Sequence, residues 1–380
     1  MTEPARRVED RLSDVSERAW RVYRKAIVVD THNDLPTKML DEGYDADARH
    51  QPSDGHTDFP RLVESGITAQ FLAAWVDAPY AARGPGAAFD RAMRCIDVIH
   101  AFVARHPDRL RFAATADAVR RAKREGTVAI LIGVEGGHAI ENSLDHLRTL
   151  KERGASYLTL TWNNGNDWAG SSIGSGGTRT AGLTDFGRAV IREANRLGLL
   201  VDVSHASDAT LADVLDTSAA PVLASHSRAR ALADHPRNLR DDQLRAIAGA
   251  GGVVCINFYA RFIDARMRLA MDEAELRAEQ LDASDAGTRA QRLTALLARI
   301  PPTPLSVLID HIEHVARVAG IDHVGLGSDF DGVLLTPARM DDVTALPRIA
   351  QALLDRGFGD EDVTKVLGAN VLRVMDAATK

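Results

Sequence analysis

The sequence predicts an α/β fold, a (β/α)8 barrel of the TIM type, from the number, composition and spacing of its apolar runs. Eight short runs rich in apolar and β-branched residues recur along the 380 residues, mostly with amphipathic helical stretches between them. Continuous apolar runs such as VAILIGV, residues 128–134, are typical of strands that are covered on both faces, as in a parallel sheet. A closed barrel is the simplest arrangement for eight such strands.

The expected strands and helices alternate along most of the chain. Strands are expected at Ile27–Asp30, Thr68–Trp75, Val128–Val134, Tyr157–Thr161, Leu199–Ser204, Pro221–Ser225, Gly252–Asn257 and His323–Gly327. The helical spacing of apolar residues is clearest in Phe89–Arg105, Phe186–Leu197 and Asp242–Ala248. We therefore expect residues 1–380 to form one domain.

Two stretches lie outside this alternation. Residues 1–25 are dense in Arg, Glu and Asp and are expected to form an N-terminal helical extension. Residues 261–300 are rich in Ala, Arg and Glu and are too long for an ordinary connection between the seventh and eighth strands. We interpret them as a helical insertion near the barrel mouth that serves as a lid or as the contact of a homodimer. A solvated helical decoration without function explains the same pattern equally well.

The composition excludes several classes of partner. Hydrophobic residues make up 45% of the chain, the net charge is −7, and basic residues are interspersed with acidic ones. This balance gives no reason to expect nucleic acid or an acidic membrane surface as a partner. The sequence also lacks an apolar run of about 18 residues and an apolar N-terminal signal segment. We therefore expect a cytoplasmic protein.

Imidazole and carboxylate side chains follow the expected strands at their carboxyl ends, where the catalytic groups of a barrel lie. Two residues that are two positions apart on an extended backbone point the same way, so both can bind one ion. The candidates are His32 and Asp34 after the first strand, Glu135 after the third, His205 and His226 after the fifth and sixth, and Asp329 after the eighth.

Six such groups at the ends of five strands indicate a metal site. A lone histidine at a strand end is more often a hydrogen-bonded structural residue, but burying this many carboxylates without a cation would be costly. Nitrogen and oxygen ligands without thiolates suit zinc, ahead of manganese, cobalt or iron. We expect two zinc ions bridged by Glu135, with His32 and Asp34 on one ion and His205 and His226 on the other. A hydroxide between the ions would be the nucleophile.

The motifs around these residues resemble the membrane (renal) dipeptidase family, the zinc dipeptidases of the amidohydrolase superfamily. The resemblance runs from about residue 26 to the segment at 370–374. Its most specific parts are GVEGGH at 133–138 and DFDG at 329–332. It implies a barrel with a binuclear zinc centre. The signal peptide, anchor signal and disulfides of the membrane-anchored animal members are not recognised here, so the chain resembles a soluble, bacterial-type member.

The resemblance also implies roles for individual residues. It supports metal binding by the five expected ligands, proton transfer or amine binding by Asp329, and binding of the terminal carboxylate of the substrate by Arg237. A guanidinium fork suits the last role, because it pairs with a carboxylate through two hydrogen bonds. At position 162 family members often carry a histidine that helps to bind the scissile carbonyl oxygen, whereas this chain has Trp162. We expect Trp162, Tyr259 and an amide such as Asn166 to contact the substrate.

These observations lead to a functional hypothesis with two alternatives. We expect a dipeptidase that hydrolyses L,L and possibly L,D dipeptides. The first alternative is a related binuclear amidohydrolase acting on N-acyl amino acids, lactones or phosphotriesters. Relatives that cleave lactones or phosphotriesters commonly bridge their metals with a carboxylated lysine, a place that Glu135 takes here. The second alternative is a metal-binding barrel without catalysis, against which the full ligand set with Asp329 argues.

Overall fold

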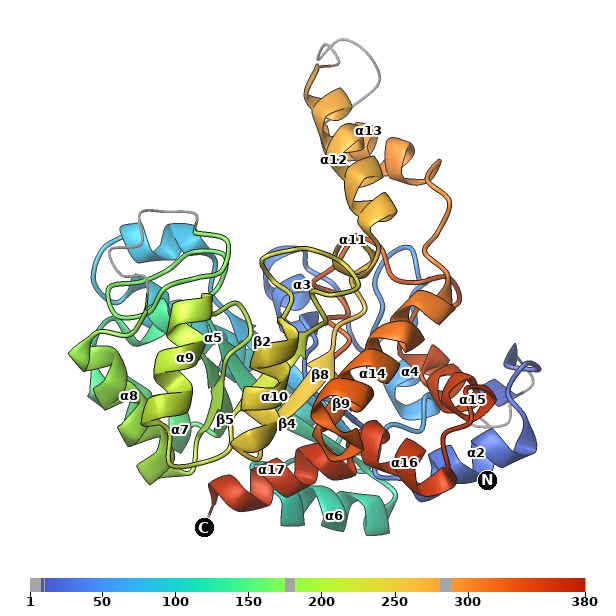
Figure 1. Cartoon of the computed structure of the whole chain (residues 1–380), viewed down its shortest axis with the longest axis horizontal. Helices are drawn as coiled ribbons and strands as arrows, with labels where there is room; N and C mark the ends of the chain where they lie inside the picture. Colours follow the sequence, from blue (N-terminus) through green and yellow to red (C-terminus); the bar gives the residue numbers. More distant parts are fainter. Residues whose placement is uncertain (1–7, 10, 175–181, 281–288, 380) are drawn as a thin grey trace.

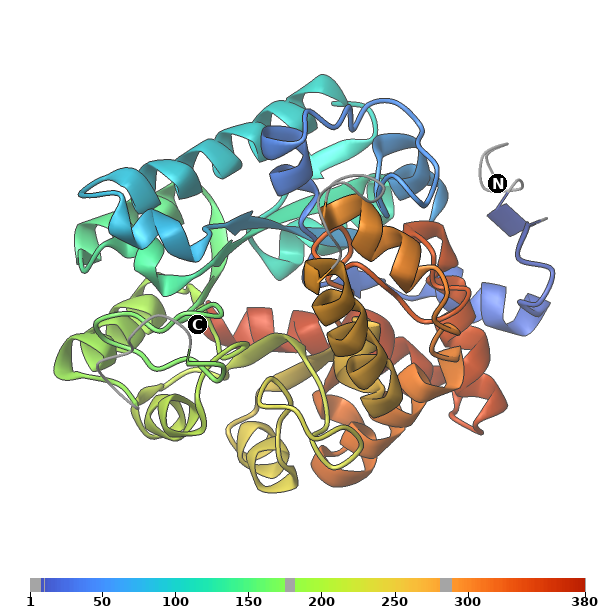
Figure 2. The ribbon, with the colours of Figure 1, turned by 90° about the horizontal axis from the view of Figure 1, so that it is seen from above.

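Nine strands form one parallel sheet in the computed structural model, which describes residues 8–9, 11–174, 182–280 and 289–379. The strands are β1 (Val29–Asp30), β2 (Ala69–Trp75), β3 (Leu110–Phe112), β4 (Val128–Glu135), β5 (Ala155–Thr159), β6 (Leu200–Asp202), β7 (Leu223–Ser227), β8 (Val253–Ile256) and β9 (Val324–Leu326). The sheet closes because β1 pairs with both β2 and β9, while β2 also pairs with β4. Eight parallel strands thus form a barrel with helices around it (Figures 1 and 2), and the predicted (β/α)8 fold is confirmed.

The helices follow the strands in the order expected for this fold. They are α2 (Glu17–Lys25), α3 (Leu35–Asp41), α4 (Phe59–Glu64), α5 (Ala87–Arg105), α6 (Ala116–Glu125), α7 (Leu144–Glu152), α8 (Asp185–Leu197), α9 (Asp208–Thr217), α10 (Asp241–Gly249), α11 (Ala260–Ile263), α12 (Ala265–Gln280), α13 (Arg289–Leu297), α14 (Leu305–Ala319), α15 (Pro347–Asp355), α16 (Asp360–Thr364) and α17 (Asn370–Ala378). Local sequence sets their ends. The hydroxyl of Thr184, for example, accepts the N–H of Gly187 to begin α8, and Gly198 ends it at φ 63°.

β3 is the strand that the sequence pattern did not reveal. It pairs with the first half of β4, from Leu110 opposite Val128 to Phe112 opposite Ile130, and β5 pairs with the second half. Leu110 is the one buried residue of its three. A strand this short, outside the barrel and mostly exposed, carries no alternating apolar pattern from which it could be recognised.

Alternation along the strands separates two apolar layers and directs Glu135 inward. On β4, Ile130 and Ile132 pack between the strands and the surrounding helices. Ala129 and Leu131 face the interior, in a cluster that includes residues of α6 and α17 below the strands (Figure 1). Side chains two apart share a face, so the interior face of β4 continues through residue 133 to Glu135 at the mouth of the barrel.

The structure describes parts of the expected helical insertion and of the expected N-terminal extension. Residues 261–300 contain α11, α12 and α13, while residues 281–288 lie outside the described residues. Figure 1 shows α12 and α13 standing out from the barrel as an arm. Of the expected N-terminal extension, α2 is described, whereas residues 1–7 and 10 are outside the described part. Each helix in the described ranges is too short or too polar to cross a lipid bilayer.

Gly133 of β4 leaves room for a tyrosine that supports the site. A Cβ atom at position 133 would lie 1.9 Å from Cζ of Tyr157, a fully buried residue of β5. The Tyr157 ring also stacks on Phe71 of β2, with 5.6 Å between ring centroids. Any side chain at position 133 therefore has to displace Tyr157 or the strand that carries it.

Replacing Gly133 by alanine should destabilise the protein by about 1 to 3 kcal/mol, because the added methyl group overpacks a filled interior. The thermal unfolding midpoint of the purified variant measures this loss. The matched control is Gly249→Ala at the end of α10, where a Cβ meets nothing within 4 Å. The control should leave the midpoint unchanged or slightly raised. Equal midpoints for the two variants would contradict the packing described for Gly133.

Candidate metal centre

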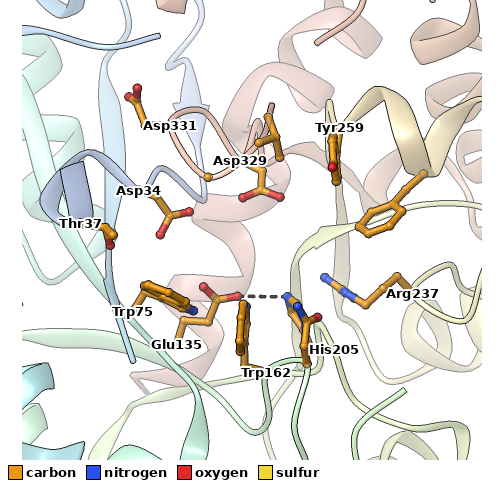
Figure 3. Close-up of a pocket in the computed structure, with 14 residues that line it drawn as sticks. Asp34, Thr37, Trp75, Glu135, Trp162, His205, Arg237, Tyr259, Asp329 and Asp331 are labelled. Carbon is orange, nitrogen blue, oxygen red and sulfur yellow. Dashed lines mark ion pairs between the residues drawn. The ribbon is translucent and has the colours of Figure 1, made fainter. Parts of the chain in front are cut away.

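The carboxyl ends of the barrel strands surround a cavity of about 260 Å³ (Figure 3). Seven of the residues that the sequence singled out line it, namely Asp34, Glu135, Trp162, His205, Arg237, Tyr259 and Asp329. His32 and His226 lie beside it, each 1% exposed, and both reach Glu135. The fold therefore brings together groups that are almost 300 residues apart in the sequence.

The two oxygens of Glu135 face two different sets of nitrogen and oxygen atoms. Oε1 lies 3.1 Å from Nε2 of His205 and 3.3 Å from Nε2 of His226. These two imidazole nitrogens are themselves 2.9 Å apart. Oε2 lies 3.4 Å from Nε2 of His32, which also lies 3.4 Å from Oδ2 of Asp34. Glu135 thus stands between one pair of donor groups and another.

His32 is held by β5 with its Nε2 directed at the carboxylates. The hydroxyl of Tyr157 donates to the carbonyl oxygen of Thr31 (3.1 Å), so its oxygen accepts the Nδ1–H of His32 (2.8 Å). This directs Nε2 at the carboxylates, and Nε2 has no hydrogen-bond partner within the described residues although it is buried. A buried imidazole nitrogen fixed in this way and facing carboxylates is suited to bind a cation.

A second network, on β6 and β7, fixes His226 in the same manner. Asp202 accepts hydrogen bonds from the hydroxyls of Ser225 (2.6 Å) and Thr159 (2.5 Å) and from the N–H of Ser225 (2.8 Å). Since the Ser225 hydroxyl donates to Asp202, its oxygen accepts the Nδ1–H of His226 (2.8 Å). The Nε2 of His226 therefore faces Glu135 with its lone pair.

Asp329 is placed by a strained backbone and a buried carboxylate beneath it. Its φ is 64°, a left-handed conformation that is costly for a residue with a Cβ. Asp30 accepts hydrogen bonds from both the N–H (2.7 Å) and the hydroxyl (2.6 Å) of Ser328, which ties the ends of β1 and β9 together. The N–H of Asp329 donates to the carbonyl oxygen of His32 (3.0 Å), and Asn257 donates to its carboxylate (2.6 Å).

Asp34 begins α3 without capping it. An aspartate at this position usually accepts an N–H of its own helix, but the Asp34 side chain makes no such bond. Its carboxylate turns instead toward His32 and the cavity (Figure 3). The residue is therefore available to bind a cation.

Burial keeps two of the histidines neutral. Burial, with repulsion from Arg237, lowers the pKa of His205 to about 3. Burial and the neighbouring His32 also lower the pKa of His226 well below its usual value. Both rings are then neutral at pH 7, and the neutral ring is the form that binds metals.

The clustered carboxylates Asp34, Glu135 and Asp329 favour positive charge in their surroundings. Burial raises the pKa of Asp34 to about 7 and also raises that of Asp329. Burial would lower the pKa of His32, but Tyr157 and the adjacent carboxylates hold it well above the ordinary value. For Glu135, burial is outweighed by the attraction of His32 and by the adjacent histidine rings, so its pKa stays well below normal. A divalent cation meets this demand for charge, so the donor set fits a metal.

Asn166 does not reach the cavity. Its amide donates to the carbonyl oxygen of Leu160 (2.9 Å), and its oxygen accepts the N–H groups of Trp168 (3.0 Å) and Ala169 (2.8 Å). These bonds shape the loop after β5, and Asn166 lines a separate cavity. No pattern in the sequence indicates that the Asn166 amide is used within this turn. Asn163 of the same loop does line the candidate site.

Trp162 forms an aromatic wall where the resemblance led us to expect a histidine. Its ring lies edge-on to Trp75, with centroids 5.0 Å apart, and 6.4 Å from the ring of His205. On another side, Tyr259 and Phe262 pack edge to face at 4.8 Å. The cavity therefore has apolar sides and charged ends.

Several residues that hold the candidate ligands in place were not predicted from the sequence. They are Tyr157, Asp202, Ser225 and Asn257. One signal was available for Asp202, because a carboxylate inside a short buried strand needs hydrogen-bond donors. Tyr157 carried no such signal, since a tyrosine in a strand usually only packs. Its role depends on meeting Thr31 and His32 across the barrel.

Comparisons with known proteins show which sequences and folds the chain resembles. A sequence model of the membrane dipeptidase family, peptidase family M19, matches residues 16–380. Dipeptidase verJ of Clonostachys rogersoniana is 35% identical over 376 residues, which span 96% of this chain and 88% of that protein. The crystal structure of the probable dipeptidase PvdM from Pseudomonas aeruginosa has the same fold, with a TM-score of 0.82 at 24% identity over 98% of each chain. A metallopeptidase of Rhodobacter sphaeroides, solved with a phosphinate mimic of the dipeptide L-Ala-D-Ala, gives a TM-score of 0.76 at 25% identity, covering 93% of this chain and 100% of that one.

Replacing Asp202 by asparagine should weaken binding of divalent metal about 10- to 100-fold, the usual cost of losing such a supporting partner. The new amide donates toward Ser225, whose hydroxyl then donates to Nδ1 of His226 and moves the ring proton to Nε2. Metal content after dialysis against graded chelator concentrations measures the effect.

The matched control for this experiment is Asp216→Asn, an exposed position on α9. It should retain metal like the unaltered protein. Equal retention by the Asp202 and Asp216 variants would contradict the proposed link from Asp202 to His226.

Proposed function

Because this chain belongs to the membrane dipeptidase family, peptidase family M19, and is a metal-dependent dipeptidase, we propose that two zinc ions at Glu135 serve its hydrolysis of small L,L and L,D dipeptides. The observation that carries the proposal is the position of Glu135 between two separate donor pairs. The Rhodobacter sphaeroides relative, solved with a mimic of an L,D dipeptide, supports the range of stereochemistry.

The donor set supports zinc, and we propose a place for each ion within it. His32 and Asp34 would hold one ion, His205 and His226 would hold the other, and Glu135 would bind both. Five nitrogen and oxygen ligands without a thiolate suit this metal. When bound, such ions activate water as a nucleophile and polarise the scissile carbonyl group.

Asp329 is the proposed proton carrier. It lines the cavity, and its Oδ1 lies 4.0 Å from Nε2 of His32. Asn257 donates to Oδ2, which fixes the carboxylate and leaves Oδ1 directed at the site. Asp329 can then take a proton from the attacking water and return it to the leaving nitrogen.

The two ends of the cavity carry opposite charge and would orient a zwitterionic substrate. Asp34 and Asp331 lie on one side, and Arg237 lies on the opposite side (Figure 3). Arg237 is proposed to bind the terminal carboxylate, while Asp331, which is not among the proposed metal ligands, binds the free amino group. A cavity of about 260 Å³ closed by charges at both ends favours dipeptides over longer chains.

Trp162 and Tyr259 are proposed to contact the side chains of the substrate. Asn163 is the amide in the loop after β5 that lines the cavity, and we assign it the contact with the scissile carbonyl oxygen. This role is not extended to Asn166, whose hydrogen-bonding groups are used within the loop.

We propose that residues 1–380 act as one domain in the cytoplasm, without nucleic-acid or membrane partners, since 46 basic residues are interspersed with 53 acidic ones. Leu269 and Leu276 of α12 are 62% and 56% exposed and lie seven residues apart, which supports a homodimer contact through the arm.

A dipeptide panel with metal-replete protein tests the function. L,L and L,D dipeptides should be hydrolysed, chelation should abolish turnover, and added zinc should restore it. Absence of cleavage of every dipeptide would overturn the proposal. Comparable turnover of lactones or phosphotriesters would instead favour the related amidohydrolases.

Replacing Asp329 by asparagine should lower kcat about 10²- to 10⁴-fold with metal content unchanged, because proton transfer is lost while the proposed ligands remain. Steady-state rates on a cleaved dipeptide, together with metal analysis, measure both quantities. Asp108→Asn, at an exposed position after α5, is the control and should keep normal turnover. Near-normal turnover of the metal-loaded Asp329 variant would exclude this residue as the proton carrier.

A further inference from the structure

A second buried arginine lies beside the cavity, and the mechanism above does not use it. Arg228 directly follows β7, two residues after His226, and is 0% exposed. Within the part of the chain that the structure describes, none of its three guanidinium nitrogens has a hydrogen-bond partner. A buried charge without a partner is costly, and most native arginines in such places are paired.

One aromatic ring separates Arg228 from the cavity. The guanidinium carbon lies 4.6 Å from the centroid of the Phe262 ring, and Phe262 lines the cavity. Phe262 belongs to α11, a helix of only four residues, and is partly exposed. For a bound substrate to reach the guanidinium group, the Phe262 ring would have to move aside.

Arg237 lies in the same basic region. It is 3% exposed, and the Nη2 contact with the carbonyl oxygen of His226 is long, at 3.4 Å. Its Nε has no hydrogen-bond partner in the described ranges. A monocarboxylate substrate needs only Arg237, so Arg228 remains available for a second anionic group.

The surroundings of Arg228 make this region electropositive. Burial and then four arginines, Arg228, Arg237, Arg268 and Arg261, lower the pKa of His235 to about 4, so this ring is neutral at pH 7 and does not share the positive charge of the arginines. Of the four, Arg261 is paired with Asp272 and Glu275, at 2.6 Å each. Asp329 is the nearby carboxylate that attracts Arg228, and it is assigned to the reaction itself.

We propose that Arg228 binds the side-chain carboxylate of an acidic residue at the C-terminal position of the dipeptide, while Arg237 binds the terminal carboxylate. The inference rests on the proposed function and specifies its substrate class as dipeptides ending in Asp or Glu. A side-chain carboxylate of that residue lies close to the terminal carboxylate, and a guanidinium fork matches it geometrically. An acidic N-terminal residue is disfavoured, because its side chain would approach Asp34 and Asp331 at the opposite end.

The test compares acidic dipeptides with their neutral isosteres. With metal-replete enzyme, kcat/KM for L-Ala-L-Glu should exceed that for L-Ala-L-Gln about 10- to 100-fold, as expected for a charge-assisted contact. L-Ala-L-Asp and L-Ala-L-Asn form the second pair. Arg228→Met should abolish the preference for acid and leave kcat/KM for L-Ala-L-Gln within about threefold of the unaltered enzyme.

Two further variants separate the roles of the arginines. Arg237→Met should lower kcat/KM for all four dipeptides, because each has a terminal carboxylate. Arg121→Met, at an exposed position on α6, should change none of them. Arg228→Lys should retain part of the preference, because the charge remains and the fork is lost.

Equal efficiency of the unaltered enzyme on Glu and Gln dipeptides would overturn the inference, and this comparison does not depend on how any variant folds. Equal losses on acidic and neutral substrates in Arg228→Met would overturn it as well. In both cases cleavage of the neutral dipeptides would still support the proposed function. Failure to cleave any dipeptide would reject the proposed function itself.

Discussion

The carboxylate of Glu135 is the group around which the whole site is arranged, because its two oxygens face different donors. On one side lie the Nε2 atoms of His205 and His226, and on the other lie His32 and Asp34. Glu135, Asp34 and Asp329 are buried carboxylates, so their like charges repel and favour a compensating cation. The strands that carry them can meet only if the barrel closes, which makes closure of the sheet a condition for the site.

The barrel interior supports this arrangement from below. Tyr157 fixes the ring of His32, and Asp202 fixes that of His226 through the hydroxyl of Ser225. Both supports lie on interior faces, above a layer of apolar side chains. The absence of a side chain at Gly133 provides the space for Tyr157. Packing and chemistry are therefore linked, since a methyl group in the core would move a hydrogen-bond partner of the candidate metal centre.

The two ends of the cavity carry opposite charges. Carboxylates are concentrated near α3 and β9, whereas Arg237 and Arg228 follow β7 on the opposite side. In the proposed function such a separation would orient a zwitterion before any bond is broken, and orientation is a large part of catalysis. The aromatic residues between the ends, such as Trp162, exclude water and strengthen both electrostatic contacts.

The sequence by itself determined the fold and the candidate ligands, because both depend on local patterns. Apolar runs such as 128–134 identify strands, and residues such as Glu135 follow them at the catalytic end of the barrel. Only the tertiary structure decided which side chains support these groups. The contact of Tyr157 with His32, the use of Asn166 within its own loop and the burial of the Arg228 guanidinium group without a partner among the described residues each arise from chain segments that approach in space. Their positions follow from closure of the barrel and from three-dimensional packing, which no spacing of residues along the chain encodes.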